Sequence, residues 1–260
     1  MSELAPIRIG CSGWMYPHWR GLFYPQKLAV KHWFGFYAEH FDTVEINNSF
    51  YRLPTPETCD AWRVQAPGGF SYAMKANRFL TQAKKLKDCA EPLDRMMTSF
   101  DRLESSLGVI LYQLPPRFRL NLERLESFLE LIPRDVTNVF EFRDASWFVD
   151  EVFALLEAHG AGFCAHDMIG LETPQIATGG AAYVRFHGGE GKYWGRYSDE
   201  RLLDWAGWMV DQARQGRTVW AYFNNDIEGQ AVQDALTLKS MLAQAEAPPP
   251  EPRRRIHDVP

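Results

Sequence analysis

The sequence contains few cysteines, and no two of them lie close together. Four occur among 260 residues, Cys11, Cys59, Cys89 and Cys164, and none forms a C-x-x-C pair. This spacing indicates neither a zinc ribbon nor a disulfide framework. Reduced thiols fit the pattern best, so we expect a cytoplasmic protein.

Long apolar runs and an excess of positive charge are also missing. No apolar stretch is long enough to span a bilayer, and residues 1–6 lack the basic segment and apolar run of a signal peptide. The formal net charge is −5, which gives no overall basic field for nucleic acid. We therefore expect neither a membrane protein nor a dedicated nucleic-acid binder. No cofactor is indicated, and the sequence does not fix the oligomeric state.

What the chain does contain is eight strand-like segments that alternate with helical patterns. The residues are 46% hydrophobic, enough for one large core. The expected strands cover residues 7–11, 42–48, 70–75, 108–114, 138–142, 162–167, 183–187 and 218–223, and the expected helices 30–40, 56–66, 92–106, 121–132, 150–159, 198–215 and a last one to 244. Eight such units predict a single-domain α/β fold, a (β/α)₈ TIM barrel, over residues 1–245. The segment 246–260, rich in Pro and Arg, is predicted to be a disordered tail.

The fifth of these strands carries two opposite charges on one face. With a period of two, Val139, Glu141 and Arg143 share one face, while Phe140 and Phe142 share the other. Ionised groups cost several kcal/mol to bury unless they are paired or used. The strand therefore predicts a polar cup at its carboxyl end.

Other strands end in the same way, and in TIM barrels these ends carry the active site. The polar side chains at or near the ends are Glu45, Asn47, Lys75, Gln113, Glu141, Arg143, His166, Arg185, His187, Tyr222 and Asn224. We predict that they converge on one cup.

Several short motifs in this order resemble one known family. They are Gly10-Cys11-Ser12-Gly13-Trp14, Val44-Glu45-Ile46-Asn47 with Phe50-Tyr51-Arg52, Gln113-Leu114-Pro115-Pro116, Glu141-Phe142-Arg143, Tyr183-Val184-Arg185-Phe186-His187-Gly188 and Tyr222-Phe223-Asn224-Asn225-Asp226. The chain is similar, from about residue 7 to 242, to the YecE-like family, also called domain of unknown function 72. The resemblance implies a TIM barrel and supplies no established reaction. At the position of Gln82 we expect many relatives to carry His, so any role of that imidazole in the relatives does not transfer to this chain.

Two glutamates are the candidate general acid and base. Paired carboxyls with separated pKa values can protonate one atom and deprotonate another, which suits Glu45 and Glu141. The alternative is that both simply balance Lys75, Arg143 and Arg185. Lys75 could also form a Schiff base if it lay among other cations, but an ion pair with Glu45 on the adjacent strand is the preferred interpretation.

Lys75 and His187 complete the candidate catalytic set, and the remaining cup residues are assigned to ligand binding. The three cations exceed the two carboxylates, which suits an anionic ligand. The candidate substrate-binding residues are Asn47, Arg143, Trp147, Arg185, Tyr222, Asn224, Asn225, Trp14 and Trp194, the tryptophans because their flat faces can stack on a sugar or base.

Two further sites are weaker hypotheses. Gly188, Gly189, Gly191 and Lys192 follow the seventh strand, where barrels often bind phosphate, although such glycines often only turn the chain and Asp226 can simply cap the last helix. A two-His-one-carboxylate metal site at Glu141, His166 and His187 is disfavoured, since Arg143 and Arg185 would repel a cation. No metal ligand is assigned.

The function expected from this pattern is an enzyme of the barrel-cup type. It would bind a small anionic or sugar- or nucleoside-like metabolite and act on it by acid/base chemistry, as a hydrolase or isomerase. A ligand-binding or regulatory barrel without catalysis is one alternative, and a metal-dependent nuclease-like barrel is another. A raised pKa and a free oxygen on either glutamate would favour the enzyme.

Overall fold

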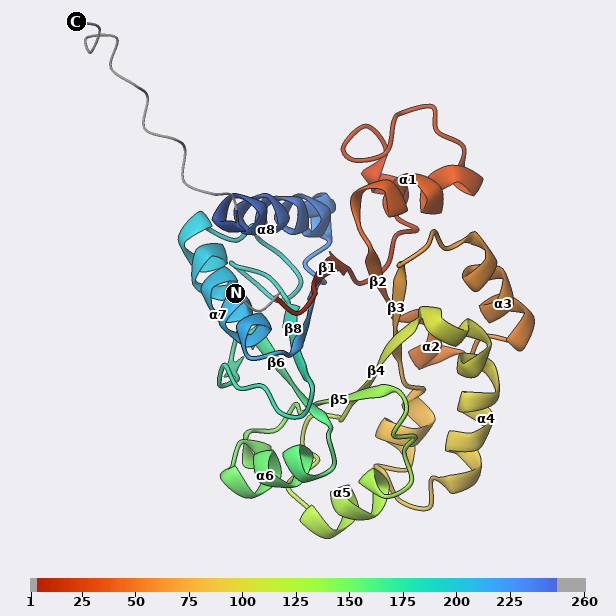
Figure 1. Cartoon of the computed structure of the whole chain (residues 1–260), viewed down its shortest axis with the longest axis vertical. Coiled ribbons are helices and arrows are strands. Elements are labelled where there is room, and N and C mark those ends of the chain that lie inside the picture. Colours follow the sequence, from red (N-terminus) through yellow and green to blue (C-terminus); the bar gives the residue numbers. More distant parts are fainter. Residues whose placement is uncertain (1–3, 247–260) are drawn as a thin grey trace, which may run out of the picture.

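A computed structural model describes residues 4–246, in which helices surround a ring of strands (Figure 1). The strands are β1 (Ile7–Cys11), β2 (Thr43–Ile46), β3 (Ser71–Lys75), β4 (Leu107–Gln113), β5 (Thr137–Glu141), β6 (Gly162–Met168), β7 (Leu171–Glu172), β8 (Ala181–Phe186) and β9 (Thr218–Phe223). The helices are α1 (Trp33–His40), α2 (Asn48–Tyr51), α3 (Pro56–Gln65), α4 (Ala90–Phe100), α5 (Leu122–Leu129), α6 (Asp150–Ala158), α7 (Asp199–Arg214) and α8 (Gln230–Glu246). Residues 247–260 of the predicted tail lie outside the described part of the chain.

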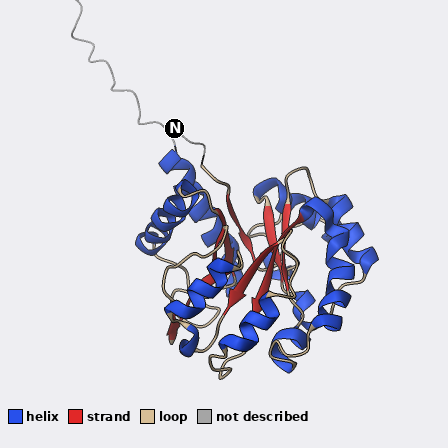
Figure 2. Cartoon of the chain, turned by 60° about the horizontal axis from the view of Figure 1, so that its bottom comes forward, coloured by secondary structure: helices blue, strands red, loops and turns tan. Residues whose placement is uncertain are grey.

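Eight of the strands are parallel and follow one another around the ring. Their order is β1-β9-β8-β6-β5-β4-β3-β2, and the short β7 pairs antiparallel with β6. In Figure 2 the strands lie inside an enclosure of helices. The predicted (β/α)₈ barrel is therefore confirmed, with β7 as a hairpin that the sequence pattern did not indicate.

One side chain joins the two strands at the ends of this order, β1 and β2. The backbone N–H of Cys11 donates to the Tyr37 hydroxyl (2.9 Å), which donates in turn to the carbonyl oxygen of Thr43 (3.0 Å). The close approach also requires Gly10, because a Cβ there would lie 2.4 Å from the same carbonyl oxygen. Tyr37 thus replaces the strand pairing that would close the barrel.

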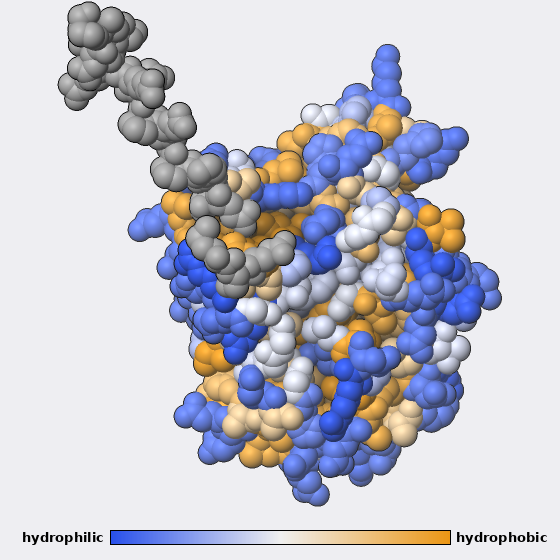
Figure 3. Space-filling model, viewed as in Figure 1, coloured by the Kyte–Doolittle hydropathy of each residue, from blue (hydrophilic) through white to orange (hydrophobic). Residues whose placement is uncertain are grey.

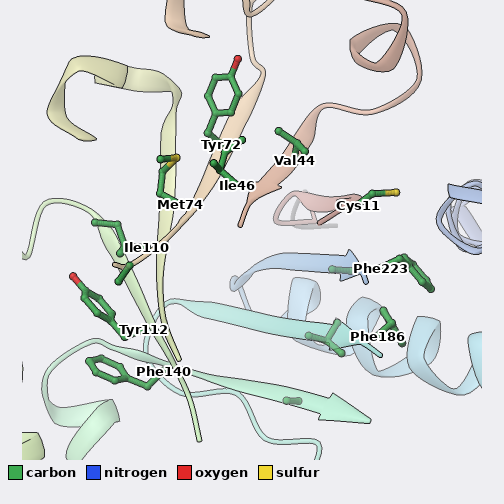
Figure 4. Packing of buried hydrophobic residues seen from close by; sticks show 14 of the residues in the cluster. Cys11, Val44, Ile46, Tyr72, Met74, Ile110, Tyr112, Phe140, Phe186 and Phe223 are labelled. Carbon is green, nitrogen blue, oxygen red and sulfur yellow. The ribbon is translucent and has the colours of Figure 1, made fainter. Parts of the chain in front are cut away.

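Two separate cores follow from the period-two pattern of the strands. Side chains such as Tyr112, Phe140 and Phe223 occupy the outer faces and pack under the helices (Figure 4). The inner faces form a smaller core of Ala73, Val109, Leu111, Val139, Cys164, Ala181, Tyr183, Trp220 and Tyr222. Because aromatic side chains fill this interior, the barrel is packed below its polar end.

The helices differ from the expected ranges mainly at their ends. The helix expected over 92–106 ends at Phe100 and continues as a 3₁₀ segment, Asp101–Ser106, inside which Glu104 has a φ of 49°. The α7 helix begins after Ser198, whose side chain caps it by accepting from the Arg201 N–H. The face of the molecule in Figure 3 is mostly hydrophilic, with apolar side chains interspersed.

Candidate functional site

A buried guanidinium lies at the centre of the polar end of the barrel. Arg185, near the end of β8, donates from Nε and Nη2 to the two carboxylate oxygens of Glu45 on β2, at 2.9 and 2.8 Å. Its Nη1 donates to Oε2 of Glu141 at the end of β5, at 2.7 Å. All three side chains are at most 1% exposed. The predicted convergence of strand ends therefore takes the form of a buried ion network.

Arg143 and His187 extend this network on one side. Arg143 forms an ion pair with the other oxygen of Glu141 and donates from Nη2 to Nε2 of His187 at 2.9 Å. Because that nitrogen accepts, the proton of the neutral ring lies on Nδ1, which faces the Arg185 carbonyl oxygen at 3.2 Å. Two arginines and two glutamates thus balance each other in charge.

The pairing determines which of these groups can exchange protons near neutral pH. Burial alone would raise the pKa of Glu45 and Glu141, but the arginines hold the pKa of both carboxyls below its usual range. Burial and the neighbouring guanidinium groups lower the pKa of His187, which stays neutral. Neither glutamate has the raised pKa expected of a general acid.

Lys75 is the one predicted cation of the cup that this network leaves out. It ends β3, its side chain is buried with 8% of the residue exposed, and its Nζ lies 4.5 Å from the centre of the Phe50 ring. Within residues 4–246 it makes no ion pair with Glu45 or any other carboxylate, so the preferred sequence interpretation is wrong. Both oxygens of Glu45 are already occupied by Arg185 and by hydroxyl groups. Burial and the positive charge of Arg185 lower the pKa of Lys75 to about 7.

A cavity of about 590 Å³ lies above the network at the carboxyl ends of the strands. It is lined by Tyr16, His18, Asn47, Tyr51, Lys75, Gln113, Arg185, Tyr193, Asn224, Asp226, Ile227 and Glu228. Its size is within the range of about 300–1,000 Å³ that is typical of small-molecule sites. Four of the predicted site residues, Asn47, Lys75, Arg185 and Asn224, therefore line one common cavity.

A histidine–carboxylate pair in the cavity wall was missed by the sequence analysis. His18 Nε2 lies 2.9 Å from Oδ2 of Asp226, and the Trp19 indole N–H donates to Oδ1 at 2.8 Å. Asp226 precedes the 3₁₀ segment Ile227–Gly229 and makes no side-chain capping hydrogen bond to it. Burial raises the pKa of this carboxyl to about 6. His18 and Asp226 are 208 residues apart, so no local spacing could have revealed the pair.

A second cavity of about 480 Å³ adjoins the first and shares Tyr16 and Asn47 with it. Trp14, Phe34 and Trp62 form its aromatic wall, and the edge of Trp14 meets the rings of both neighbours. Trp14, which was assigned to ligand contact from the sequence, therefore lies beside the cup rather than in it.

Trp147 and Tyr222 are buried away from both cavities. Trp147 stacks on Phe142 with ring centres 4.7 Å apart, and its indole N–H donates to the Phe118 carbonyl oxygen at 2.6 Å. Tyr222 lies in the inner core, where its hydroxyl is 2.6 Å from the Thr43 hydroxyl. Both side chains have their polar atoms satisfied inside the protein. Neither of them lines the cavities in which a ligand contact was predicted.

The loops after β8 and β9 use their own polar groups. Asn225 is fully buried and donates to the carbonyl oxygen of Gly195 and to Asp234. The amide of Gly188 donates to the Tyr197 hydroxyl, and that of Gly191 to the carbonyl oxygen of Trp194. These amides are therefore not free to bind a phosphate.

The remaining predicted groups are Trp194, in the loop after β8, and the residues of the disfavoured metal site. Trp194 is 42% exposed and lines neither cavity. Within residues 4–246 no three His, Cys, Asp or Glu side chains are grouped so that they could hold a metal ion. The disfavoured metal site fails on geometry, because Arg143 lies against both Glu141 and His187. His166 has its Nε2 on the Phe142 carbonyl oxygen at 3.1 Å.

Comparisons with known proteins place the chain among proteins of unknown function. UPF0759 protein YunF of Bacillus subtilis is 26% identical over 91% of this chain and 94% of its own length. UPF0759 protein YecE of Escherichia coli K12 is 29% identical, but the match spans 55% of this chain and 50% of YecE.

Solved structures show the same architecture. A DUF72 family protein from Thermotoga maritima MSB8 superposes with a TM-score of 0.83 at 29% identity, over 92% of this chain and 99% of the other. One from Enterococcus faecalis V583 has a TM-score of 0.78 at 20% identity, over 91% and 95%. Among residues 4–246 no helix is long and apolar enough to cross a membrane. A model described as "Protein of unknown function DUF72" matches residues 8–255, and the chain therefore belongs to the DUF72 family.

Proposed function

We propose that the cavity at the mouth of the barrel binds a small polar metabolite and acts on it by acid/base chemistry. Phosphorylated, carboxylate, sugar-like and nucleoside-like compounds are the classes that its size and its polar lining suit. Hydrolysis and isomerisation are the reaction classes that need only proton transfer.

One observation carries this proposal: two groups that titrate near neutrality face the same cavity. Burial lowers the pKa of the Lys75 amine to about 7 and raises that of the Asp226 carboxyl to about 6. An acid and a base whose pKa values approach the working pH from opposite sides are the usual means of proton transfer in enzymes. We therefore assign to Lys75 and Asp226 the role that the sequence suggested for Glu45 and Glu141.

A negatively charged ligand fits the same arrangement. The arginines and glutamates beneath the cavity balance each other, so Lys75, when it is protonated, is a buried positive charge without a carboxylate partner among residues 4–246. A phosphate or carboxylate beside Nζ would pair with it and raise its pKa. Binding of such a ligand should therefore take up protons above neutral pH.

A thermal-shift screen tests the proposal. Phosphorylated sugars, nucleotides and organic acids are each added to the wild type, to Lys75→Met and to Lys27→Met, in which an exposed lysine outside the cavity is changed. A ligand at about 100 times its Kd adds ~2.7 kcal/mol of stability, which raises the Tm by several degrees. We expect one class to stabilise the wild type and Lys27→Met but not Lys75→Met. Stabilisation that survives in Lys75→Met would place the ligand elsewhere.

A ligand-binding or regulatory barrel is the second candidate, and the paired glutamates favour it. Glu45 and Glu141 are ionised, fully buried and held by Arg185, which suits a rigid support better than a reacting group. Incubation of the stabilising compound with the protein, followed by NMR spectroscopy of the small molecule, separates the two candidates, because NMR detects isomers as well as hydrolysis products. An unchanged compound favours the binding protein.

A further inference from the structure

We infer that Lys75 is a nucleophile that forms an imine with the carbonyl carbon of a small aldehyde or ketone in the cup. This inference rests on the proposed function, because it takes the cavity above the ion network as the substrate site. It goes further by naming the covalent step and the substrate class.

The position of Lys75 is the first argument. Its side chain leaves the carboxyl end of β3 and reaches the wall of the 590 Å³ cavity, where it is 8% exposed. The ring of Phe50, from α2, lies 4.5 Å from Nζ. A nucleophile needs this combination of a buried stem, which fixes the amine, and a tip that faces a substrate-sized space.

The absence of a partner for the amine is the second argument. Within the described residues Lys75 Nζ makes neither a hydrogen bond nor an ion pair, although Glu45 and Glu141 are near enough to influence it. Both carboxylates face Arg185, and Glu141 also faces Arg143. A structural lysine in a cluster of carboxylates would normally pair with one of them. Here the arginines have taken that role, so the amine remains available.

The charges around Lys75 favour its neutral form, which is the reactive one. They come from three strands: Glu45 on β2, Glu141 and Arg143 at the end of β5, and Arg185 on β8. Burial is the largest influence, and the repulsion from Arg185 comes next, so the pKa falls to about 7. About half of the Lys75 amines are then unprotonated at neutral pH, whereas fewer than about one in a thousand ordinary lysines are.

The bonds formed and broken in this step balance, and the protein itself supplies the proton donor. The amine nitrogen bonds to the carbonyl carbon, the carbon–oxygen π bond breaks, and a proton passes from nitrogen to that oxygen to give a carbinolamine. The carbon–oxygen single bond then breaks, and the hydroxyl leaves as water with a proton from Asp226. The nitrogen lone pair forms the C=N bond of an iminium ion. Asp226 suits this task because it faces the same cavity, paired with His18.

An iminium at this position would serve proton-transfer chemistry. Its positive nitrogen withdraws electrons through the C=N carbon, so a C–H or C–C bond of the next carbon breaks more easily than in the parent carbonyl compound, and its electron pair moves towards nitrogen. The carboxylate of Asp226 can then take up the released proton. The reaction classes that follow are isomerisation and carbon–carbon cleavage or formation.

Reductive trapping tests this inference. The wild-type protein is incubated with glycolaldehyde or pyruvate and sodium cyanoborohydride, which reduces an iminium to a stable secondary amine, and tryptic peptides are then analysed by mass spectrometry. We expect the adduct on Lys75 to form about 10-fold or more faster at pH 7 than on the exposed Lys27, because of its larger neutral fraction. Modification of Lys27 with Lys75 unmodified would overturn the inference.

The result is read in the wild type, so it does not depend on the folding of a variant. One further variant locates the reaction in the cup. Asp226→Asn should slow adduct formation on Lys75 without slowing it on Lys27, since it removes the proton donor for water loss. Equal rates in Asp226→Asn and the wild type would contradict its part in the step.

The same data separate this inference from the proposed function. If a ligand stabilises the wild type but not Lys75→Met, and no carbonyl probe modifies Lys75, then the cup remains the ligand site and the imine is refuted. If Lys75 is modified selectively, the covalent step stands. Failure of both experiments would refute the cup as a site for small metabolites.

Discussion

The lowered pKa of Lys75 leads to a quantitative prediction about the stability of the protein. Its pKa is about 7 in the folded chain against 10.5 for an ordinary lysine. Between these values the unfolded chain binds more protons than the folded one, so the free energy of unfolding rises with pH across this window. The side chain therefore lowers the stability of the protein at neutral pH and ceases to do so in alkali.

The size of this effect follows from the same two values. At ~1.4 kcal/mol for each pH unit, the full difference corresponds to ~5 kcal/mol. Between pH 7 and pH 10 the wild type should gain ~3 kcal/mol relative to a variant that has no amine. Lys75→Met keeps most of the apolar stem and removes the charge, so it should be more stable than the wild type at pH 7 and lose this advantage towards pH 10.

Urea denaturation measures the effect directly. Unfolding free energies of the wild type, Lys75→Met and Lys27→Met are compared at several pH values from 7 to 10. Buried tyrosines and cysteines titrate alike in all three proteins, so their contributions cancel in the differences. A difference between the wild type and Lys75→Met that does not change with pH would refute the reasoning, because Lys75 would then have an ordinary pKa. Lys27→Met should show no such trend.

Three further changes test the framework of the site. Arg185→Met leaves Glu45 and Glu141 buried without their main partner, and we expect a loss of ~3–5 kcal/mol in unfolding free energy by urea denaturation; an unchanged midpoint would contradict the network. Tyr37→Phe removes the hydroxyl between β1 and β2 and should cost ~1–3 kcal/mol, measured in the same way, whereas an effect near zero would mean that water replaces the bridge. Gly10→Ala places a carbon 2.4 Å from a carbonyl oxygen of β2 and should lower the Tm; a variant that melts like the wild type would show that the strands can separate.

The strand pattern of the sequence contained most of the fold. Alternation in segments such as 138–142 separates Val139 and Glu141 from Phe140, and the structure places these side chains in the inner barrel and the outer core as predicted. This works because a strand has only two faces, so the period alone decides which residues share one. The charged ends of β2, β5 and β8 could be predicted for the same reason.

The partners of these charges could not be predicted in this way. Arg185 and Glu45 are 140 residues apart. Glu45 pairs with Arg185 and not with Lys75 because of the lengths and directions of these side chains across the barrel. Trp147 was assigned to a ligand because it follows a charged strand end, yet its indole fits beneath the loop against Phe142. A side chain's surroundings depend on which elements pack around it, and a single sequence does not encode that locally.

By itself, then, the sequence determined the eight-fold alternation, the two faces of each strand and the presence of charge at the carboxyl ends. Only the tertiary structure decided that the arginines neutralise both glutamates, that Lys75 remains unpaired, and that His18 meets Asp226 across 208 residues. The physical reason is that pKa and reactivity depend on burial and on distances of a few ångströms between atoms that the fold brings together.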